Sequence, residues 1–539
     1  MEKKKGKLTE RYEVVLMTVS LLIIGGVVTF LTLYPEQGNA IASSILYMLT
    51  RTFGSTMQII TVIITVFLIA LCFTKYGDIK LGKGKPQYKT MSWVAMMFFC
   101  GQGSGTVYWA FTEWGYHFNA APQLNGVEVS EPMAYELALA YSIYDWGPIP
   151  WALLCIFVLP FAFHYYIKKD DELKFSLLTK YAVGEKRAKG VFGKVVDFIF
   201  IFSAVGSICI TAGAAGSTIA IVFADLIGIE YSFGLTFAVL LGVAILYSAS
   251  SLLGIEKGMR RISDWNIYFC LTLLALILFM GPTQFIIDSM VNAMGILSTE
   301  VVRMTLWTDP VAVTGYPQDW TVFYFVYWFV FGPFTGLFVA KISKGRTLRE
   351  IILNMLITGS AGMVMFFGIV TAYQQNLRIT GILDIPGMLA SGQSAETIAL
   401  DTLRTLPMSS IMIVLYLTVT ILFLATTLDA TSFALSSTVS KNLGSNEEPK
   451  KGLKLVWCLV LISIPVAITY AGTNINTIKA FVIATGMPLV IIIGIIYYGF
   501  LKEMKKDFGH MTKEEIQKGD FLEDADFGKE VVAEEAIEG

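Results

Sequence analysis

Residues 320–341 read WTVFYFVYWFVFGPFTGLFVAK, and no charged side chain occurs before Lys341. A helix needs about 20 predominantly apolar residues to cross the hydrocarbon core of a membrane. This stretch meets both conditions and predicts a membrane-spanning helix. Eleven other stretches of the same kind lie on either side of it. The twelve predicted spans are 14–34, 54–74, 90–118, 133–166, 195–225, 233–254, 264–288, 320–341, 351–374, 409–438, 453–472 and 478–501.

The composition agrees with this interpretation. Of the 539 residues, 55% are hydrophobic and 15% are charged, whereas an ordinary soluble domain has about 25% charged residues. We therefore predict an all-α, multi-pass membrane protein, and we exclude a soluble multidomain protein, a disordered chain and a disulfide scaffold. The net charge of −2 gives no electrostatic reason to expect a nucleic-acid partner.

The basic residues predict the orientation of the spans, because lysine and arginine are enriched in cytoplasmic loops. With the N-terminus inside, all but five of the 40 basic residues fall on cytoplasmic segments. The exceptions are Arg51, Arg303, Arg378, Arg404 and Lys479. We expect a protein of the cell (inner) membrane with both termini in the cytoplasm.

Reactive side chains are few and scattered along the chain. The six cysteines lie inside apolar stretches without a C-x-x-C pair, and the three histidines are His117, His164 and His510. A membrane-embedded enzyme needs histidine, aspartate or cysteine side chains that converge on one site. We therefore expect no enzymatic activity, no bound metal and no cofactor.

Two of the predicted spans contain glycine-rich sequences, GQGSG at 101–105 and GPFTG at 332–336. Helices broken at corresponding points of two halves are typical of secondary transporters. Irregular backbone is tolerated at membrane depth where it is buried in protein or lines a cavity. The alternative is that small residues allow two helices to cross closely.

If these sequences interrupt their helices, the third and eighth spans each begin a five-helix repeat, and the first two spans are peripheral. Apolar residues with helical spacing between 289 and 319 predict an external interfacial helix. The last 38 residues contain 12 acidic and 6 basic side chains, so we expect a solvated, mobile tail. The predicted regions are 1–89 (N-terminal arm and spans 1–2), 90–288 (first repeat), 289–319 (external helix or loop), 320–501 (second repeat) and 502–539 (acidic cytoplasmic tail).

Aromatic residues gather close to the glycine-rich sequences. The fourth span contains DWGPIPW at 145–151, the eighth contains WTVFYFVYWFVF at 320–331, and Tyr116 follows the glycines of the third. The faces of such rings attract cations, and a cage of them suits a quaternary ammonium group. The alternative is ordinary packing or an interfacial aromatic belt.

The acidic residues within the predicted spans include Glu113, Asp145 and Asp429, and an ionisable residue at such a place is a functional hypothesis by default. We expect Asp429 of the tenth span to bridge helices and not to meet the substrate. Glu113 is a candidate pathway carboxylate or a group bonded to backbone. Asp145 adjoins Trp146; it either favours a cationic substrate or is satisfied by nearby helix N–H groups.

The sequence DWTVFYFVYW at 319–328 resembles the signature of the betaine/carnitine/choline transporter family. KGRTLRE at 344–350 is similar to that family's next cytoplasmic turn, and LWTDP at 306–310 is most similar to its carnitine/γ-butyrobetaine antiporters. The resemblance covers nearly the whole chain. It implies two inverted five-helix repeats, a central substrate site and a homotrimer.

The resemblance also carries over six substrate-binding aromatics, of which the first three form the family's aromatic box: Trp146, Tyr327, Trp328, Tyr116, Trp151 and Phe331. This chain departs from the family pattern at Phe325 and Tyr327, which replace two tryptophans. Asp145 stands where the family often has histidine.

For the coupling ion the resemblance points in two directions. Thr426 and Thr427 match the paired hydroxyl groups that hold sodium in sodium-coupled relatives. Arg260 matches an arginine that serves the carnitine antiporter as a fixed substitute for sodium, although an ordinary positive-inside residue is the alternative.

We therefore expect a secondary transporter of a trimethylammonium zwitterion of the carnitine, γ-butyrobetaine or glycine betaine type. The expected mechanism is sodium-independent exchange by alternating access. The alternative is a sodium-coupled symporter of glycine betaine or choline.

Overall fold

A computed structural model describes residues 12–121, 129–170, 172, 174–253, 260–441, 443, 447–470, 475–524 and 527–528. Regular structure in these residues is helical, and the β pairing consists of two isolated bridges, Tyr12 with Ser440 and Lys80 with Thr347. The prediction of an all-α protein is confirmed.

The first half of the chain forms long helices joined by short connections. They are α2 (Val14–Leu33), α3 (Pro35–Phe73), α4 (Thr90–Trp109), α5 (Glu113–Asn119), α7 (Glu131–Tyr144), α8 (Pro148–Tyr166), α11 (Val191–Ile227), α12 (Phe233–Leu253) and α13 (Arg260–Met280). Short turns η1 (Lys75–Asp78), η2 (Ser176–Thr179), α9 (Lys180–Val183) and α10 (Glu185–Ala188) lie between them.

The second half begins with α14 (Thr283–Leu306) and a π-helical turn, η4 (Gln318–Val322), that leads into α15 (Phe323–Ile342). It continues with α16 (Leu348–Leu353), the π-helical η5 (Asn354–Gly359), α17 (Ser360–Ile379), α18 (Ile385–Ala390), α19 (Ala395–Arg404), α20 (Ser409–Val439), α21 (Lys451–Tyr470), α22 (Ile475–Phe508), α23 (Lys513–Lys518) and η6 (Asp520–Leu522).

Ten helical segments in the described residues are long and apolar enough to cross a membrane. Nine of them coincide with predicted spans, and the tenth is α14, which the sequence predicted as an interfacial helix. The other three predicted spans fall on the helices α4 and α5, α12, and α21. Among the described residues, every predicted span therefore falls mainly on helix, while the number twelve stays a prediction.

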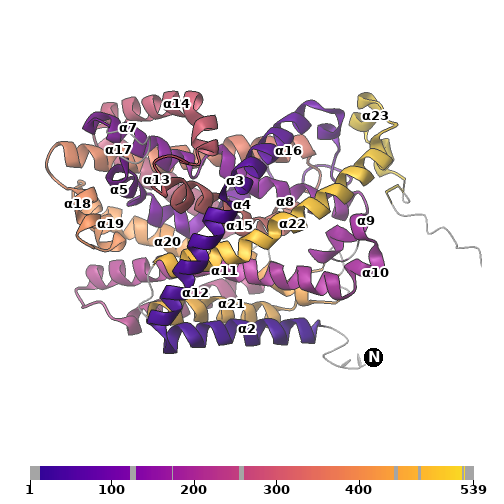
Figure 1. The fold of residues 1–539 in the computed structure, drawn as a ribbon, viewed down its shortest axis with the longest axis horizontal. Helices are drawn as coiled ribbons and strands as arrows, with labels where there is room; N and C mark the ends of the chain where they lie inside the picture. The colour runs from indigo at the N-terminus through magenta and orange to yellow at the C-terminus, as the bar shows by residue number, and fades with distance from the viewer. Residues whose placement is uncertain are drawn as a thin grey trace, which may run out of the picture.

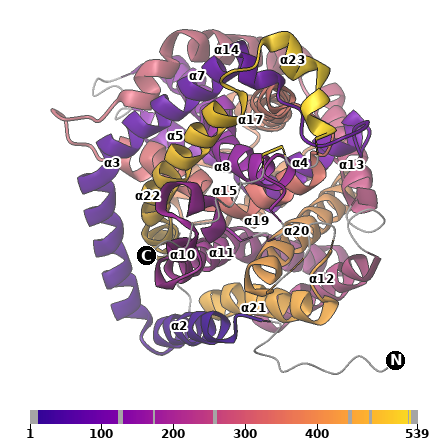
Figure 2. The same ribbon diagram turned by 90° about the vertical axis from the view of Figure 1, so that its right-hand side faces the viewer.

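Different short helices lie at the two ends of the bundle. The start of α2, the short helices α9 and α10, and α23 lie at one end, on the right in Figure 1, and α5, α18 and α19 lie at the other. Helices α2 and α3 run along the outside of the bundle, with α2 beside α21 (Figure 2). Their peripheral position agrees with the prediction.

The predicted interruptions at 101–105 and 332–336 are wrong, because α4 and α15 run through both sequences as continuous helix. At Gly332 and Gly336 a Cβ atom would lie 2.1 and 2.8 Å from Phe157 of α8. These glycines therefore permit a close crossing of α8 and α15, which is the alternative that small residues allow.

The backbone breaks instead at two other places. Residues 110–112 separate α4 from α5, and residues 145–147 separate α7 from α8. At the second break Pro148 opens α8; proline lacks the N–H of a helix interior and disfavours helical geometry at the residue before it. The sequence DWGP thus ends one helix and starts the next.

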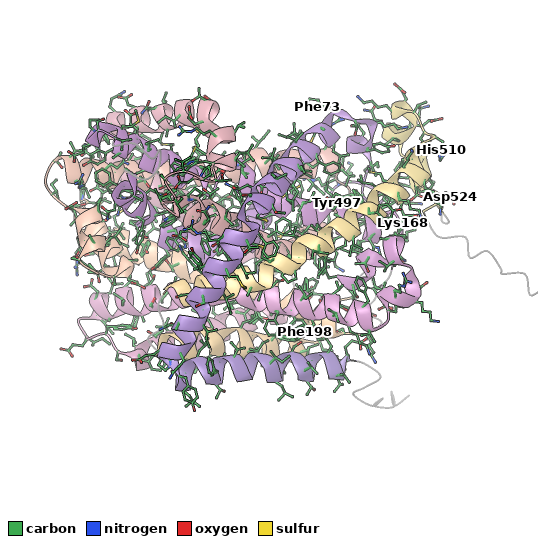
Figure 3. All side chains as sticks on the ribbon, viewed as in Figure 1. Phe73, Lys168, Phe198, Tyr497, His510 and Asp524 are labelled. Carbon is green, nitrogen blue, oxygen red and sulfur yellow. The ribbon has the colours of Figure 1, made fainter. Side chains whose placement is uncertain are left out.

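The C-terminal segment up to Asp524 is folded onto the bundle, so the expectation of a mobile tail is wrong for these residues. Ile516 of α23 is fully buried, and Lys75 Nζ donates to the backbone oxygens of Gly509 and Met511 at 2.9 and 2.6 Å. His510 and Asp524 lie at the same end of the molecule as Lys168 (Figure 3).

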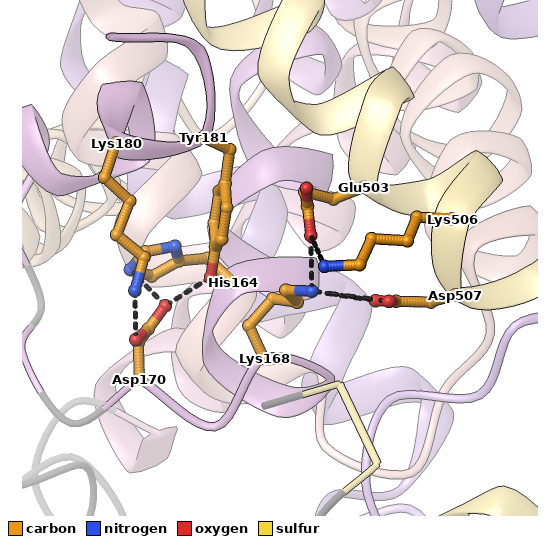
Figure 4. A network of polar contacts seen from close by, with 8 residues as sticks. All are labelled: His164, Lys168, Asp170, Lys180, Tyr181, Glu503, Lys506 and Asp507. Atoms are coloured by element: carbon orange, nitrogen blue, oxygen red, sulfur yellow. Dashed lines mark hydrogen bonds and ion pairs between the residues drawn. The ribbon is translucent and has the colours of Figure 1, made fainter. Parts of the chain in front are cut away.

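A polar network fixes α22 at this end (Figure 4). Lys168 Nζ, with a side chain 1% exposed, pairs with Glu503 at 2.7 Å and with Asp507 at 3.0 Å. Beside it, Asp170 pairs with Lys180 at 2.5 Å and accepts a hydrogen bond from Tyr181 Oη at 2.8 Å. Buried ion pairs with several partners hold elements in one register, because each charge would be costly to leave unpaired.

Candidate substrate site

An aromatic cluster lies where the start of α8 meets the middle of α15. The rings of Trp146 and Trp328 are 5.0 Å apart at 82°, and Trp146 also stacks on Phe367 of α17 at 4.8 Å. Trp328 Nε1 donates to the backbone oxygen of Asp145 at 2.9 Å. The helix break at 145–147 thus supplies both an aromatic ring and the carbonyl group that orients a second ring.

Two further predicted aromatics complete this cluster. The ring of Tyr327 lies 5.0 Å from Trp328 and 4.8 Å from Phe331. All four side chains are at most 2% exposed. The structure therefore brings together Trp146, Tyr327, Trp328 and Phe331, and we call these four residues the aromatic box.

The other two predicted aromatics lie elsewhere. Tyr116 is half-buried and contacts Trp320, whose ring stacks on Tyr324 at 6.3 Å; Tyr324 in turn contacts the Trp146 ring at 6.1 Å. Trp151 lies further along α8, where it stacks on Phe98 at 6.0 Å. Tyr116 is thus connected to the box through two rings, whereas Trp151 packs against α4.

Helix α4 reaches the box at Gly105. A Cβ atom at this position would lie 3.2 Å from Tyr327 Oη and 3.3 Å from the Trp146 ring. The GQGSG sequence therefore brings the α4 backbone close to the box without breaking the helix. The prediction that these glycines lie at the site is supported at Gly105, whereas the predicted break of the helix is absent.

Beside the box, α5 presents two buried polar side chains one turn apart. His117 Nε2 lies 3.4 Å from Glu113 Oε1 and 3.4 Å from Asp145 Oδ2, and these three side chains are at most 1% exposed. We call them the acid–histidine cluster. The expectation that no histidine converges with acidic groups is wrong for His117, although its i,i+4 spacing from Glu113 was visible in the sequence.

Hydrogen bonds tie the cluster to its surroundings. Trp146 Nε1 donates to Glu113 Oε2 at 2.8 Å, and Tyr324 Oη donates to the same oxygen. Tyr316 Oη lies 2.7 Å from His117 Nδ1. Glu113 therefore bonds to side chains that line the site and not to backbone, and its carboxylate holds a ring of the box.

Asp145 is held less completely. In the part of the chain that the structure describes, no helix N–H group donates to its carboxylate, so the alternative that such groups satisfy it is not supported. Its one close polar partner there is His117, whose Nε2 lies 3.4 Å from Oδ2, and a buried carboxylate with so few partners is costly. This leaves an acidic group available to a cation at the edge of the box.

Comparison with known proteins agrees with this arrangement. The family model described as "BCCT, betaine/carnitine/choline family transporter" matches residues 15–509. The chain belongs to the betaine/carnitine/choline transporter family. Members of this family are transporters and not enzymes, as the sequence predicted.

Two similar sequences cover most of the chain. The "Carnitine transporter" of Acinetobacter baumannii is 32% identical over 503 residues, which are 93% of this chain and 91% of that protein. The "Uncharacterized transporter YeaV" of Escherichia coli K12 is 32% identical over 450 residues, 84% of this chain and 93% of that one. Among solved structures, a sodium-coupled sialic acid symporter matches 85% of this chain and 87% of its own, with 15% identity and a TM-score of 0.44.

A buried lysine of α22 lies next to the site of this family member, and sequence reasoning missed it. Lys479 was counted as an external loop charge, yet it is 7% exposed. Its Nζ lies 4.5 Å from the ring centres of both Trp320 and Phe323 and donates to the backbone oxygen of Asp319 at 3.3 Å. The ammonium group of Lys479 thus lies against two aromatic rings beside the box.

The predicted coupling residues lie on α20 and at the start of α13. Thr426 Oγ1 and Thr427 Oγ1 both donate to the backbone oxygen of Phe423, at 2.8 and 3.0 Å, and both side chains are buried. Their oxygens keep free lone pairs that can accept a cation. The side chain of Arg260 lies outside the described residues, so its position relative to the threonines stays a prediction.

The acidic residue of span ten bridges two helices. Asp429 of α20 pairs with Lys454 of α21 at 3.3 Å, and both side chains are at most 4% exposed. The interpretation of Asp429 as a helix-bridging residue is confirmed. Asp429 thus joins α20, the helix that carries Thr426 and Thr427, to α21.

A hollow in the described residues lies away from the box. Its volume is about 870 Å³, and Tyr135, Asp288 and Arg378 are among the residues that line it, between α7, α14 and α17. The four box residues contact one another instead of enclosing a space of this size. The box is therefore closed around its own rings in this conformation.

Proposed function

We propose that this secondary transporter carries a trimethylammonium zwitterion of the carnitine, γ-butyrobetaine or glycine betaine type. The observation that carries the proposal is the aromatic box with the carboxylates of Glu113 and Asp145 at its edge. A trimethylammonium group cannot donate strong hydrogen bonds, so aromatic faces and nearby negative charge are what attract it. The similarity to a protein named carnitine transporter supports the same substrate class.

Binding requires the box rings to separate. Trp146, Tyr327, Trp328 and Phe331 contact one another, and the helix break before Pro148 gives Trp146 a backbone that can move relative to α8. Alternating access then exposes the opened box to each side of the membrane in turn. The family resemblance assigns Trp151 and Phe331 to the pathway and Tyr116 to substrate binding.

We further propose that transport is an exchange that does not use sodium. By the family resemblance, the guanidinium of Arg260 stands in for the ion near Thr426 and Thr427. The second candidate is sodium-coupled symport of glycine betaine or choline. The two buried threonine hydroxyls favour it, because hard oxygen ligands suit a small alkali cation.

The test is uptake of labelled substrate by the purified protein in liposomes. Carnitine, γ-butyrobetaine, glycine betaine and choline are each supplied outside, with or without sodium and with each compound preloaded inside. If transport is an exchange, uptake should require a preloaded counter-substrate and should be the same with and without sodium. Absence of transport for all four compounds would contradict the substrate class.

The proposal extends to location and assembly. We propose a protein of the inner membrane with both termini in the cytoplasm; the shared position of the α2 start and α23 at one end of the bundle supports a common side for the termini. A homotrimer follows from the family resemblance alone. Accessibility of cysteines placed at each terminus, and native mass spectrometry in detergent, test these two points.

A further inference from the structure

The acid–histidine cluster holds more negative charge than its partners neutralise. We propose that Glu113, His117 and Asp145 form a proton-binding site whose occupancy controls the aromatic box. The coupling of this proton to substrate movement rests on the proposed function, whereas proton binding by the cluster does not.

Charge balance is the first argument. Glu113 and Asp145 bring two carboxylates into a place from which solvent is excluded. Two like charges in such a place disfavour each other, and burial disfavours both. Lys479, one aromatic ring away from His117 across Trp320, balances one of the two. One negative charge remains, and a single proton neutralises it.

The geometry provides a place for that proton. His117 Nε2 lies at the same distance, 3.4 Å, from an oxygen of each carboxylate. A proton on Nε2 therefore faces both acids, and Tyr316 Oη holds the opposite ring nitrogen at 2.7 Å. The carboxylate of Asp145, whose Oδ2 faces the same nitrogen, is the second place where a proton can reside.

The remaining groups around the cluster do not supply this charge. Tyr141 of α7 lies 5.7 Å from His117 between ring centres, and Tyr316 and Tyr324 contribute hydroxyl groups. Asp319 offers its backbone oxygen to Lys479. The Asp319 carboxylate also acts on Lys479, but Arg51 opposes its charge, so the two offset each other and one negative charge still remains. Further out on α14, Glu300 and Arg303 pair with each other at 3.7 Å.

A proton fits the site better than a larger cation. The three side chains are fully enclosed, and a hydrated ion would need an open path to reach them. A proton moves along hydrogen-bonded hydroxyls, and Tyr316 provides such a link to His117 Nδ1. Sodium and zinc remain the ions against which the site must be tested.

The cluster is connected to both tryptophans of the box. Trp146 Nε1 donates to Glu113 Oε2 at 2.8 Å, and Trp328 Nε1 donates to the backbone oxygen of Asp145 at 2.9 Å. Hydrogen bonds to an ionised acceptor are about twice as strong as neutral ones. A proton added to His117 places a positive charge 3.4 Å from Glu113 Oε1. This charge competes with Trp146 for the Glu113 carboxylate, so protonation weakens the Trp146 hydrogen bond and favours separation of the rings, which is the change that substrate entry requires.

The first experiment measures proton binding without substrate. Tryptophan fluorescence of the purified full-length protein is followed from weakly acidic to weakly alkaline pH, with sodium absent. The wild type should show a saturable transition, which Glu113→Gln and Asp145→Asn should each displace or remove. Asp197→Asn is the matched control. Asp197 is also a buried carboxylate, but it lies near the start of α11, where it accepts a hydrogen bond from the backbone N–H of Ser176 in η2. Its transition should equal that of the wild type.

The second experiment measures coupling in liposomes. With counter-substrate preloaded, an inward proton gradient should raise uptake of the transported trimethylammonium compound several-fold in the wild type and in Asp197→Asn. Glu113→Gln and Asp145→Asn, whatever their own uptake rates, should each show the same rate with and without the gradient. His117→Gln keeps a polar group of similar size and serves as an independent variant. Gel filtration and thermal unfolding confirm that each variant is folded.

The outcomes separate the two proposals. A fluorescence transition with no transport of any of the four compounds would reject the proposed substrate class and leave the proton site standing. Transport with no transition that depends on Glu113 or Asp145 would reject the proton site. A saturable response to sodium or zinc that abolishes the pH transition would assign the cluster to that ion and would also reject the proposal.

Discussion

At the scale of single residues, the box depends on Trp328, whose ring contacts Trp146, Tyr327 and Phe331. We predict that Trp328→Ala weakens substrate binding by about 1–2 kcal/mol, the range for a desolvated cation–π contact. That is roughly a 5- to 30-fold increase in Kd. Trp328→Phe should lose less, because an aromatic face remains. Substrate titration of the purified variants measures both effects.

The control for this prediction is another fully buried tryptophan. Trp457 of α21 is 0% exposed and lies on a different helix from every box residue. Trp457→Ala should lower thermal stability and leave substrate affinity unchanged. Equal affinity of wild type and folded Trp328→Ala would remove Trp328 from the site.

A pH-dependent prediction belongs to Asp170, in the connection after α8. Burial opposes ionisation of this carboxylate, but His164 and Lys180 hold its pKa below the ordinary value. A depressed pKa in the folded state stabilises the protein above the unfolded pKa, which is about 3.9 for aspartate. The contribution is lost as pH falls through the folded pKa. Asp170→Asn should therefore reduce stability at neutral pH, and its difference from the wild type should vanish in strong acid.

Thermal unfolding of both proteins in detergent, repeated over a series of pH values, measures this difference. Its expected size at neutral pH is about 1 kcal/mol, because Asp170 is partly exposed and solvent screens its pair with Lys180. A difference that grows on acidification would contradict the sign of the argument.

At the scale of helices, the crossing of α8 and α15 rests on two glycines that face Phe157. Gly332→Ala places a Cβ atom 2.1 Å from the Phe157 ring and should destabilise the protein by about 1–3 kcal/mol, as overpacking does. Phe157→Ala should relieve part of this clash, so the double variant should be more stable than the sum of the single effects allows. Additive losses would show that the crossing does not bring these residues together.

The same helices show which features of the fold could be predicted from the sequence. Long apolar stretches determine where helices form, so each predicted span falls on helix. A helix break is decided by local competition that composition does not reveal: Gly332 and Gly336 stay helical and lie against Phe157, whereas DWGP breaks where Pro148 opens a new helix. The break that we predicted at 332–336 is absent, and the one at 145–147 was not predicted.

The same limit applies to the site. Trp146, Tyr327, Trp328 and Phe331 were predicted from the family resemblance and do come together. His117 and Lys479 were not, because their importance arises from side chains distant in sequence, Asp145 in one case and Trp320 in the other. From the sequence alone, a single histidine or a lysine next to a loop does not indicate a site, because its partners are known only from the packing of the helices.

At the scale of the whole molecule, the folded C-terminal segment and the network around Lys168 join α22 to the α8 end of the bundle. Helix α22 also carries Lys479 at its opposite end, beside the box. One long helix therefore links the ion pairs at one side of the protein to the aromatic cluster deep inside it. A conformational change that moves α22 must act on both.

The last prediction concerns the ion that drives the whole cycle. If Arg260 places its guanidinium about 4 Å from Thr426 and Thr427, a sodium ion there meets a repulsion of about 4 kcal/mol at an effective dielectric constant near 20. That is enough to exclude sodium from a site of ordinary affinity. Wild-type uptake in liposomes should then be the same in sodium and in potassium at constant ionic strength. Arg260→Ala should slow uptake and make it respond to sodium, because the threonine oxygens become free to bind the ion. A saturable sodium dependence in the wild type would reject the surrogate charge and favour sodium-coupled symport.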